Sequence, residues 1–426
     1  MSTILTPDIC VIGGGSGGLT VAAAAASFGV DVVLIEKGKM GGDCLNYGCV
    51  PSKAILAAAK TAHAIDTAKN FGIGVGTGVK INHKKVNQHI RSVINTIAPH
   101  DSPERFTSLG VKVIEDAGVF EDPKTVTAGK YTIKARRFVI ATGSSAFVPP
   151  IPGLADVPYF TNENLFDNEK FLPHLIIIGG GPIGMEMAQA HRRLGSEVTV
   201  IEGFRALGKD DPELANVVLE KMRMEGVKIL EGALVSKVEK SGRSNVAITY
   251  KIGNEETTIK GSHILVATGR APNVKKLGLD YAKIDHDNRG IKVKSDLRTS
   301  NKRVYAIGDV AGGLQFTHVA GYHAGLVIRG ILFRKKAVPN NDIIPWVTYT
   351  DPEMAHVGLS EDAAREKHKE IKVLRFPYNE NDRAIAERKT AGLIKITTNK
   401  KGKLLGVSIA GTNAGEMINM WALALS

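Results

Sequence analysis

The sequence predicts an α/β fold: two domains built on parallel sheets, followed by a smaller α+β domain. Three observations support this prediction. A glycine motif occurs twice, an acidic residue follows each copy at the same distance, and the hydrophobic pattern changes near Pro339. With 426 residues, 43% of them hydrophobic, the chain is also too long for a single ordinary core.

The first copy is the segment DICVIGGGSGGLTVAAAAASFGVDVVLIEKG near the N-terminus. An apolar strand leads into Gly13-x-Gly15-x-x-Gly18, an alanine-rich helix follows, and a second apolar strand ends at Glu36. The first glycine permits a tight turn, the second lets the backbone approach a pyrophosphate, and the third lets the helix pack on the strand. The terminal acid accepts hydrogen bonds from an adenosine ribose.

The second copy, HLIIIGGGPIGMEMAQAHRRLGSEVTVIEG, repeats this order with Gly179-x-Gly181-x-x-Gly184 and Glu202. One glycine-rich turn can arise from packing alone, but two complete copies predict two Rossmann-like dinucleotide-binding domains. Glu202 favours NAD over NADP because a carboxylate binds a free ribose 2′-hydroxyl and repels a 2′-phosphate. Arg205 would soften this preference if it faced the phosphate; a solvated loop cation is the simpler interpretation.

Each copy continues through a β-rich section and ends in the same tripeptide, at residues 141–143 in the first and 267–269 in the second. A later strand ends at Asp309, ahead of another helical pattern. From Pro339 the alternating segments WVTYTDPEMAHVG and GLIKITTNKKGKLLGVSIAG flank a charged helix, SEDAAREKHKE. This pattern predicts the third, α+β domain.

Composition excludes several classes of protein. The net charge of +12 is spread along the chain, with no basic tract longer than FRKK near Lys335, so nucleic acid is not an expected partner. No stretch approaches the ~20 apolar residues of a membrane span, and the N-terminus lacks the basic segment of a secretory signal. Three cysteines argue against a secreted disulfide scaffold, so we expect a cytoplasmic protein.

Two of the three cysteines lie in GGDCLNYGCVPSK. Pro51 suits the first turn of a helix, so Cys49 should lie at a helix N-terminus, where the helix dipole favours a thiolate, with Lys53 one turn further on. Cys44 and Cys49 could form a static disulfide, half of a metal site or a redox pair. A second ligand pair for a metal is missing from the sequence, and a short static loop stabilises little in a reducing compartment, which favours the redox pair. Cys10 is interpreted as a small buried apolar residue.

A redox dithiol in a chain with two dinucleotide sites implies an electron relay. Nicotinamide does not readily reduce a disulfide directly, so the expected intermediate carrier is a flavin. The first site would then bind FAD and the second NAD(H).

These residues resemble the flavin-dependent pyridine nucleotide-disulfide oxidoreductases, whose branches include dihydrolipoamide dehydrogenase, glutathione reductase and mercuric reductase. The resemblance covers essentially the whole chain and rests on GGDCLNYGCVPSK, both glycine motifs, both ATG segments, GRAPN, AIGDV and DPEMAHVGLSE. It implies that Cys49 contacts the flavin and that Cys44 attacks the substrate. It also pairs Lys53 with Glu186 beside the flavin, although Glu186 could be an ordinary helix-surface acid.

The resemblance further implies that Asp309 holds the ribityl chain of FAD and that His318 lies near the flavin's pyrimidine edge; His318 could equally be a polar residue at a helix start. No metal site is expected. The expected catalytic residues are Cys44, Cys49, Lys53 and Glu186. The expected FAD contacts are Gly13, Gly15, Gly18, Glu36, Lys53, Gly118, Thr142, Gly143, Asp309 and His318, and the expected NAD contacts are Gly179, Gly181, Gly184, Glu202 and Gly269.

The motifs disagree on the branch of the family. PSK and Glu202 point away from glutathione reductase, whereas Asp43, in place of the family's usual Thr, and QFTHVAGYHAG point towards the mercuric-reductase-like branch. Asp43 should raise the pKa of the adjacent Cys44 thiol by charge repulsion, or it simply caps a turn. The chain ends at GEMINMWALALS, before the His-Glu pair or terminal Cys pair that the family carries, so we expect an incomplete C-terminal domain.

The predicted activity is FAD-dependent NAD(P)H:disulfide oxidoreduction like that of dihydrolipoamide dehydrogenase, in a homodimer. The alternatives are mercuric-reductase-like reduction of a metal ion or other small acceptor, and a non-catalytic FAD-binding redox sensor. The expected domains are FAD-binding at 1–150 and 271–338, NAD(P)-binding at 151–270, and an interface domain at 339–426.

Overall fold

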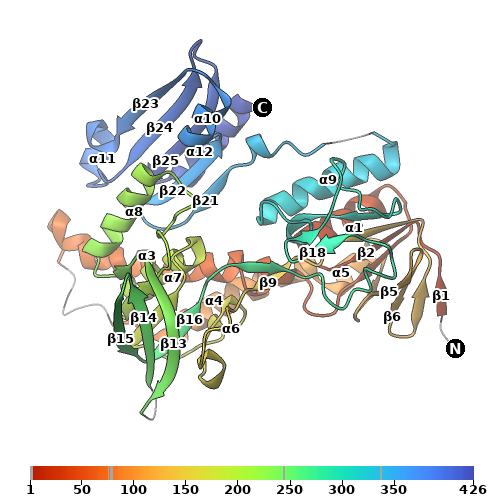
Figure 1. Ribbon diagram of the computed structural model, residues 1–426, viewed down its shortest axis with the longest axis horizontal. Coiled ribbons are helices and arrows are strands. Elements are labelled where there is room, and N and C mark those ends of the chain that lie inside the picture. Colours follow the sequence, from red (N-terminus) through yellow and green to blue (C-terminus); the bar gives the residue numbers. More distant parts are fainter. Residues whose placement is uncertain (1–2, 75, 77–79, 243–244, 336–337) are drawn as a thin grey trace. The chain divides into compact units, whose positions relative to one another are not determined.

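The computed structural model describes residues 3–74, 76, 80–242, 245–335 and 338–426. They form two compact units, each assembled from three segments of the chain. Unit 1 comprises Met1–Pro51, Arg91–Ala146 and Arg270–Pro339; unit 2 comprises Ser52–Ile90, Phe147–Gly269 and Asn340–Ser426. Figure 1 shows the course of the chain through these segments.

Unit 1 is centred on a five-stranded sheet in which all neighbouring strands are parallel. Its central strand is apolar and completely buried, as expected for a parallel sheet covered on both faces. The strands, in spatial order, are β20 (Val304–Ala306), β8 (Arg137–Ile140), β2 (Ile9–Ile12), β3 (Val32–Ile35) and β4 (Val111–Ile114).

Alternate residues of β2 belong to two different cores. Ile9 and Val11 pack with helices α1 (Ser16–Ser27) and α9 (Thr317–Phe333), which lie on one face of the sheet (Figure 1). Cys10 and Ile12 pack on the other face, against a small sheet. That sheet comprises β1 (Thr3–Leu5), β7 (Tyr131–Ile133), β6 (Thr125–Ala128) and β5 (Val119–Asp122).

The remaining elements of unit 1 are short and carry most of the candidate site. They are α2 (Gly42–Asn46), η2 (Ala98–Asp101), α5 (Pro103–Ser108), the strand pair β9 (Ser144–Ala146) and β17 (Arg270–Pro272), the pair β18 (His286–Asp287) and β19 (Gly290–Ile291), and η4 (Gly308–Ala311).

Unit 2 repeats the architecture with a four-stranded parallel sheet, covered on one face by a three-stranded meander. Helix α7 (Pro182–Arg193) follows the first strand of the sheet, and α8 (Pro212–Met224) follows the second. The sheet is β12 (Lys228–Leu230), β11 (Glu197–Ile201), β10 (His174–Ile178) and β16 (His263–Val266), and the meander is β13 (Ala233–Ser241), β14 (Asn245–Ile252) and β15 (Glu255–Gly261).

Unit 2 also contains the predicted α+β domain, an antiparallel sheet with helix α12 (Ala414–Leu425) packed on it. The predicted fold class is therefore confirmed. The sheet is β21 (Trp346–Thr348), β22 (Glu353–Gly358), β25 (Leu404–Gly411), β24 (Leu393–Asn399) and β23 (Ile371–Pro377). Further helices are α3 (Cys49–Thr67, of which Cys49–Pro51 belong to unit 1), α4 (His83–Ile97, of which Arg91–Ile97 belong to unit 1), α6 (Asn162–Leu165), α10 (Glu361–Lys367), α11 (Asp382–Ala386), η1 (Ala68–Phe71), η3 (Leu154–Asp156), η5 (Asn341–Ile343) and η6 (Tyr378–Glu380).

Among the helices of the described ranges, none has the length and hydropathy that a membrane span requires.

Candidate active site

The two glycine motifs form matching turns, one in each unit. Gly13 has φ +112° and Gly179 has φ +110°, a backbone conformation that strongly favours glycine. A Cβ at Gly18 would lie 1.8 Å from the Gly13 carbonyl oxygen, and one at Gly184 would lie 2.1 Å from that of Gly179. The close approach of helix to strand thus requires glycine at the third position of both motifs.

The acid of the first motif is fixed by backbone amides. Glu36 Oε2 accepts a hydrogen bond from Gly14 N at 2.5 Å, and Oε1 accepts one from Gly38 N at 2.6 Å. These contacts place the carboxylate at the carboxyl end of β3, beside the glycine turn. Ligands bind at this edge in open parallel sheets.

The acid of the second motif is held in the same way. Glu202 accepts from Gly180 N at 2.7 Å and from Phe204 N at 2.9 Å. The guanidinium of Arg205 donates to the Asp210 carbonyl at 3.1 Å, so this cation is engaged in its own loop. Gly269, also predicted to contact NAD, lies just after β16 with φ +134°.

The N-termini of α1 and α7 have the chemistry that a pyrophosphate needs. Gly15 and Gly181 are their N-cap residues, and neither helix has a side-chain cap for its first amides. A Cβ at Gly181 would meet no atom within 4 Å, so the approach is open. The amides and the helix dipole can bind phosphate at both turns, and the residues present therefore fit FAD at the first and a nicotinamide dinucleotide at the second.

Three further predicted FAD residues lie in loops of unit 1. Thr142 Oγ1 donates to the Asn273 carbonyl at 2.9 Å, and Gly143, with φ +65°, directly precedes β9. Gly118 precedes β5, and a Cβ there would lie 3.2 Å from Ile35 Cδ1. Thr142 and Gly143 therefore shape the strand end, whereas Gly118 packs against the apolar core.

Asp309 and His318 lie in η4 and in the first turn of α9. The Asp309 carboxylate accepts from the Ser144 hydroxyl at 2.5 Å. Burial raises the pKa of Asp309, and the Ser144 hydrogen bond opposes that rise. His318 is exposed, with its ring stacked on that of Phe316 at a centroid distance of 5.5 Å.

The two cysteines are neighbouring free thiols. Cys44 lies half-buried in α2, and Cys49, which is exposed, is the first residue of α3. Cys49 Sγ lies 3.2 Å from Thr317 Oγ1. The pKa of Cys44 is raised well above its usual value by its hydrogen bond with Cys49, by burial and by the negative charges of Cys49 and Asp43; the Thr317 hydroxyl opposes this.

The helix that carries Cys44 is seated directly on the first glycine turn. Gly41 N donates to the Gly14 carbonyl at 2.9 Å. A Cβ at Gly42 would lie 2.7 Å from the Cα of Gly15. The thiol-bearing segment and the turn that would hold the FAD pyrophosphate therefore pack backbone to backbone.

A charged chain of contacts lies beside the thiols. Arg270, whose side chain is 13% exposed, donates from Nε to the Ser144 hydroxyl and from Nη2 to the Ser144 carbonyl, both at 2.7 Å. Its Nη2 also lies 3.2 Å from Asp43 Oδ1. The Ser144 hydroxyl donates to Asp309, and Asp309 Oδ2 also lies 3.9 Å from Arg270 Nε. The guanidinium therefore lies close to two carboxylates, those of Asp43 and Asp309.

In unit 2, Lys53 and Glu186 form the predicted ion pair, with Nζ 2.9 Å from Oε2. Glu186 is 5% exposed, and its other oxygen accepts from Tyr349 N at 3.0 Å. The Lys53 ammonium lies 4.3 Å from the centre of the Tyr349 ring. Glu186 is therefore a buried, fully engaged carboxylate and not a helix-surface acid.

The same face of α7 carries further polar contacts. Gln189 exchanges two hydrogen bonds with the Asp351 backbone, at 2.8 and 2.7 Å. One turn further on, Arg193 pairs with Glu225 at 2.7 Å and with the Asp351 side chain at 2.9 Å. Together with Glu186, these side chains fix α7 against the segment that precedes β22.

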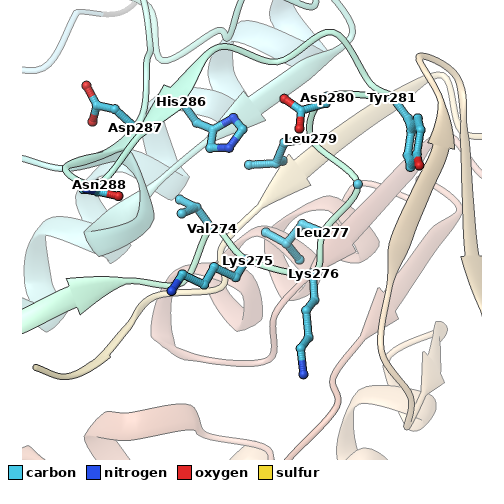
Figure 2. A pocket seen from close by; sticks show the side chains of 11 residues that line it. Val274, Lys275, Lys276, Leu277, Leu279, Asp280, Tyr281, His286, Asp287 and Asn288 are labelled. Atoms are coloured by element: carbon cyan, nitrogen blue, oxygen red, sulfur yellow. The ribbon is translucent and has the colours of Figure 1, made fainter. Parts of the chain in front are cut away.

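One pocket of unit 1 lies away from these residues. It has a volume of about 520 Å³ and is formed by the loop 274–281 and the turn 286–288 (Figure 2). Figure 2 shows the Lys275 and Lys276 side chains extending out from this loop. None of the predicted site residues lines it, so it is no part of the candidate active site.

Family models account for nearly the whole chain. The model described as pyridine nucleotide-disulphide oxidoreductase matches residues 7–324, and that of the family's dimerisation domain matches residues 344–426. The chain belongs to this family. The predicted family and enzyme class are confirmed, and the second match supports a homodimer.

Its relatives carry two different names. The chain is 35% identical to the mercuric reductase of Bacillus cereus over 98% of its own length and 66% of that protein, so it spans slightly less than two thirds of this relative. It is 34% identical to the dihydrolipoyl dehydrogenase of Staphylococcus aureus, over 98% of its own length and 90% of that enzyme. Among solved structures, the HOCl-induced flavoprotein disulfide reductase RclA of Escherichia coli matches with a TM-score of 0.86 and 26% identity, covering 98% of this chain and 93% of that one.

The family accordingly supports FAD and a pyridine nucleotide as cofactors.

Three residues at the thiols were missed by the sequence reasoning: Ser144, Arg270 and Thr317. Arg270 lies in GRAPN and Thr317 in QFTHVAGYHAG, and both segments had been used only as evidence of the family resemblance. A polar residue one position before His318 was the available signal for Thr317.

Proposed function

We propose that the chain is an FAD-dependent, NADH-linked oxidoreductase whose Cys44–Cys49 pair passes electrons to a disulfide of the lipoyl type. The observation that carries the proposal is the contact between the two thiols, on a segment seated on the first dinucleotide turn. Neither a static disulfide nor half of a metal site would require the Cys44 segment to pack on the dinucleotide turn. In the net reaction NADH, one proton and the substrate disulfide give NAD⁺ and two thiols.

The chain's own residues would hold the cofactors at the two turns. The α1 amides would bind the FAD pyrophosphate, Glu36 the adenosine ribose and Asp309 the ribityl chain; the α7 amides and Glu202 would bind NADH. FAD, when bound, supplies the two-electron carrier that a nicotinamide can reduce and a disulfide can reoxidise.

The thiol steps follow from the unequal settings of the two sulfurs. The Cys44 thiolate attacks one substrate sulfur and forms a mixed disulfide, and the departing thiolate takes up a proton. Cys49 then attacks the Cys44 sulfur, which releases the second substrate thiol and leaves a Cys44–Cys49 disulfide. Because the pKa of Cys44 is raised, its proton must be removed before it attacks, whereas the Thr317 hydroxyl can donate to Cys49 as a thiolate.

Lys53 and Glu186 would act as a fixed charge pair. The buried carboxylate accepts hydrogen bonds from the Lys53 ammonium and from Tyr349 N, which restricts where that ammonium can lie. The family resemblance implies that this pair would act on the reactive flavin nitrogen when FAD is bound.

NADH is the proposed nucleotide. The Glu202 side chain is held next to the second turn, where a ribose 2′-phosphate would have to approach, and Arg205 donates to the Asp210 carbonyl. Both features disfavour NADPH.

Mercuric ion is the second candidate acceptor. Relatives of up to 35% identity are named mercuric reductase, and Asp43 departs from the usual dihydrolipoamide dehydrogenase motif.

The test is a steady-state comparison of lipoamide, oxidised glutathione and mercuric ion, each with NADH and with NADPH. We expect the highest kcat/KM with NADH and lipoamide. Cys44→Ser and Cys49→Ser should each lower it by about 1,000-fold, whereas Cys10→Ala, which changes the buried cysteine of β2, should leave it unchanged. Turnover that survives both active-site substitutions would contradict the proposal, and a preference for mercuric ion would favour the second candidate.

A further inference from the structure

Asp43 lies in α2 directly before Cys44, and contacts on both sides restrict its carboxylate. Its Oδ1 lies 3.2 Å from Arg270 Nη2, and a Cβ at Gly48 would lie 2.8 Å from its Oδ2. Gly48 directly precedes Cys49, and Asp43 directly precedes Cys44. The carboxylate thus faces the guanidinium on one side and the turn leading to Cys49 on the other.

Arg270 is fixed independently of Asp43. Strand β17 pairs with β9, and the guanidinium makes two hydrogen bonds of 2.7 Å to Ser144 of that neighbouring strand. A planar guanidinium held at two points has a defined orientation, and here its Nη2, which already donates to the Ser144 carbonyl, also lies towards Asp43. The positive charge near Asp43 is therefore a side chain fixed by the strand pair.

A bare carboxylate beside a nucleophilic thiol would oppose loss of the thiol proton, and an adjacent cation would offset that effect. The groups that act on Cys44 are Cys49, Asp43 and the Thr317 hydroxyl. Asp43 in turn is opposed by Arg270 and joined by the nearby Asp309 carboxylate. The electrostatic potential at the thiols therefore depends on whether the Asp43–Arg270 ion pair is intact.

We propose that the Asp43–Arg270 ion pair is a positioning element that sets how readily Cys44 gives up its proton and hence how strongly the thiol pair reduces its substrate. This inference rests on the proposed function and adds two residues to it. Asp43 restrains ionisation of Cys44 and Arg270 limits that restraint, so removing them has opposite effects.

The test uses the reduced holoenzyme and measures alkylation of Cys44 by iodoacetamide, followed by mass spectrometry, from about pH 6 to pH 10. Asp43→Asn should lower the pH of half-maximal reactivity by a few tenths of a pH unit (on the order of 0.3), and Arg270→Gln should raise it by a similar amount. The double substitution should return it close to the wild-type value. Arg270→Lys, which keeps the charge but loses the two-point attachment to Ser144, should shift it in the same direction as Arg270→Gln and by less, and it provides the measurement if Arg270→Gln fails to fold.

The equilibrium of the thiol pair with a lipoate buffer gives a second measurement. Where Cys44 is ionised, Asp43→Asn should favour the reduced protein by about twofold and Arg270→Gln should disfavour it by a similar factor. Asp101→Asn is the matched control, because that carboxylate borders Gly41 of the same loop: a Cβ there would lie 3.0 Å from Asp101 Oδ2. It should leave both measurements unchanged.

A purely structural role predicts shifts of the same sign in both single variants, and that result, or no shift in either, would overturn the inference. Failure of the proposed function is distinguishable from it. A wild-type protein that oxidises NADH with none of the acceptors would refute the function, while the alkylation profile would still report on the ion pair.

Discussion

Helices α1 and α7 occupy the same place after the same glycine motif, yet their buried faces differ. In α1 the buried residues are glycine, leucine, valine and alanine. In α7 they include Glu186, Gln189 and His191. At matched distances from the first glycine, exposed Thr20 of α1 corresponds to Glu186, and buried Ala25 corresponds to His191.

The difference shows that one turn geometry supports two kinds of helix. Helix α1 packs closely on α9 through small residues, and the chemistry of unit 1 lies in the loop seated on its turn. Helix α7 uses polar side chains to bind Lys53 and the segment before β22. The glycine motif therefore specifies the phosphate turn, and the residues after it specify what the helix does.

The largest expected effect concerns His191, which is 7% exposed and whose pKa burial lowers to about 4. The His191 imidazole binds a proton near pH 6.5 in the unfolded chain and only near pH 4 in the folded chain. Its effect is that the free energy of unfolding is highest above pH 6.5 and falls as the pH decreases towards 4. The loss should reach about 3 kcal/mol. Fluorescence reports unit 2, because both tryptophans, Trp346 and Trp421, lie there.

His191→Ala gives α7 the residue of α1 and should flatten this dependence relative to wild type. His89→Gln, at an exposed position of α4, should retain it. If His191→Ala lost as much stability as wild type between pH 6.5 and pH 4, the buried imidazole would not be the cause of that loss.

The glycine turns come next. Gly18→Ala and Gly184→Ala should each destabilise their unit by about 2 kcal/mol, because each Cβ would lie within about 2 Å of a backbone carbonyl. Gly18→Ala should lose FAD, measured by its absorbance after gel filtration, whereas Gly184→Ala should keep FAD and bind NADH weakly. Gly325→Ala, in open space in α9, should be stable. Loss of FAD from Gly184→Ala alone would reverse the assignment of the two turns.

A smaller effect is expected at Glu186. Glu186→Gln keeps the shape but removes the charge that pairs with Lys53, and it should slow reduction of the bound flavin by NADH about tenfold in stopped-flow measurements. Thr20→Ala, at the matching position of α1, should leave the rate unchanged. Equal effects of the two substitutions would argue against a special role for the polar face of α7.

The smallest effect concerns Thr317, on the helix that packs beside α1. Thr317→Val removes a hydroxyl that lowers the pKa of Cys44, and it should raise the pH of half-maximal Cys44 alkylation by a few tenths. Thr317→Ser should restore the wild-type profile. A valine variant indistinguishable from wild type would mean that the hydroxyl does not act on the thiols.

Sequence reasoning reached the elements whose chemistry is local. The glycine turns, Glu36 and Glu202 each depend on one strand–turn–helix unit, and the class of the third domain follows from alternating strands. Cys49 was expected at a helix start because Pro51 follows it, and α3 does begin at Cys49.

Contacts between distant segments could not be predicted in this way. Arg270 contacts Asp43 across a large separation in the chain, and its strand β17 pairs with β9; no local sequence pattern encodes either contact. Glu186 was predicted to pair with Lys53 from the family motif, but the Tyr349 amide that holds its other oxygen comes from a separate part of the chain. The catalytic and cofactor-binding roles expected for the site residues, Gly118 and His318 included, stay predictions.

The contact of Gly42 with Gly15 has a kinetic consequence. Because α2 rests on the first glycine turn without side chains between them, no loop has to close within unit 1 to bring the Cys44 segment to that turn. Steps that depend on this part of the molecule should be insensitive to solvent viscosity. A dependence of turnover on solvent viscosity would then come from steps outside this contact.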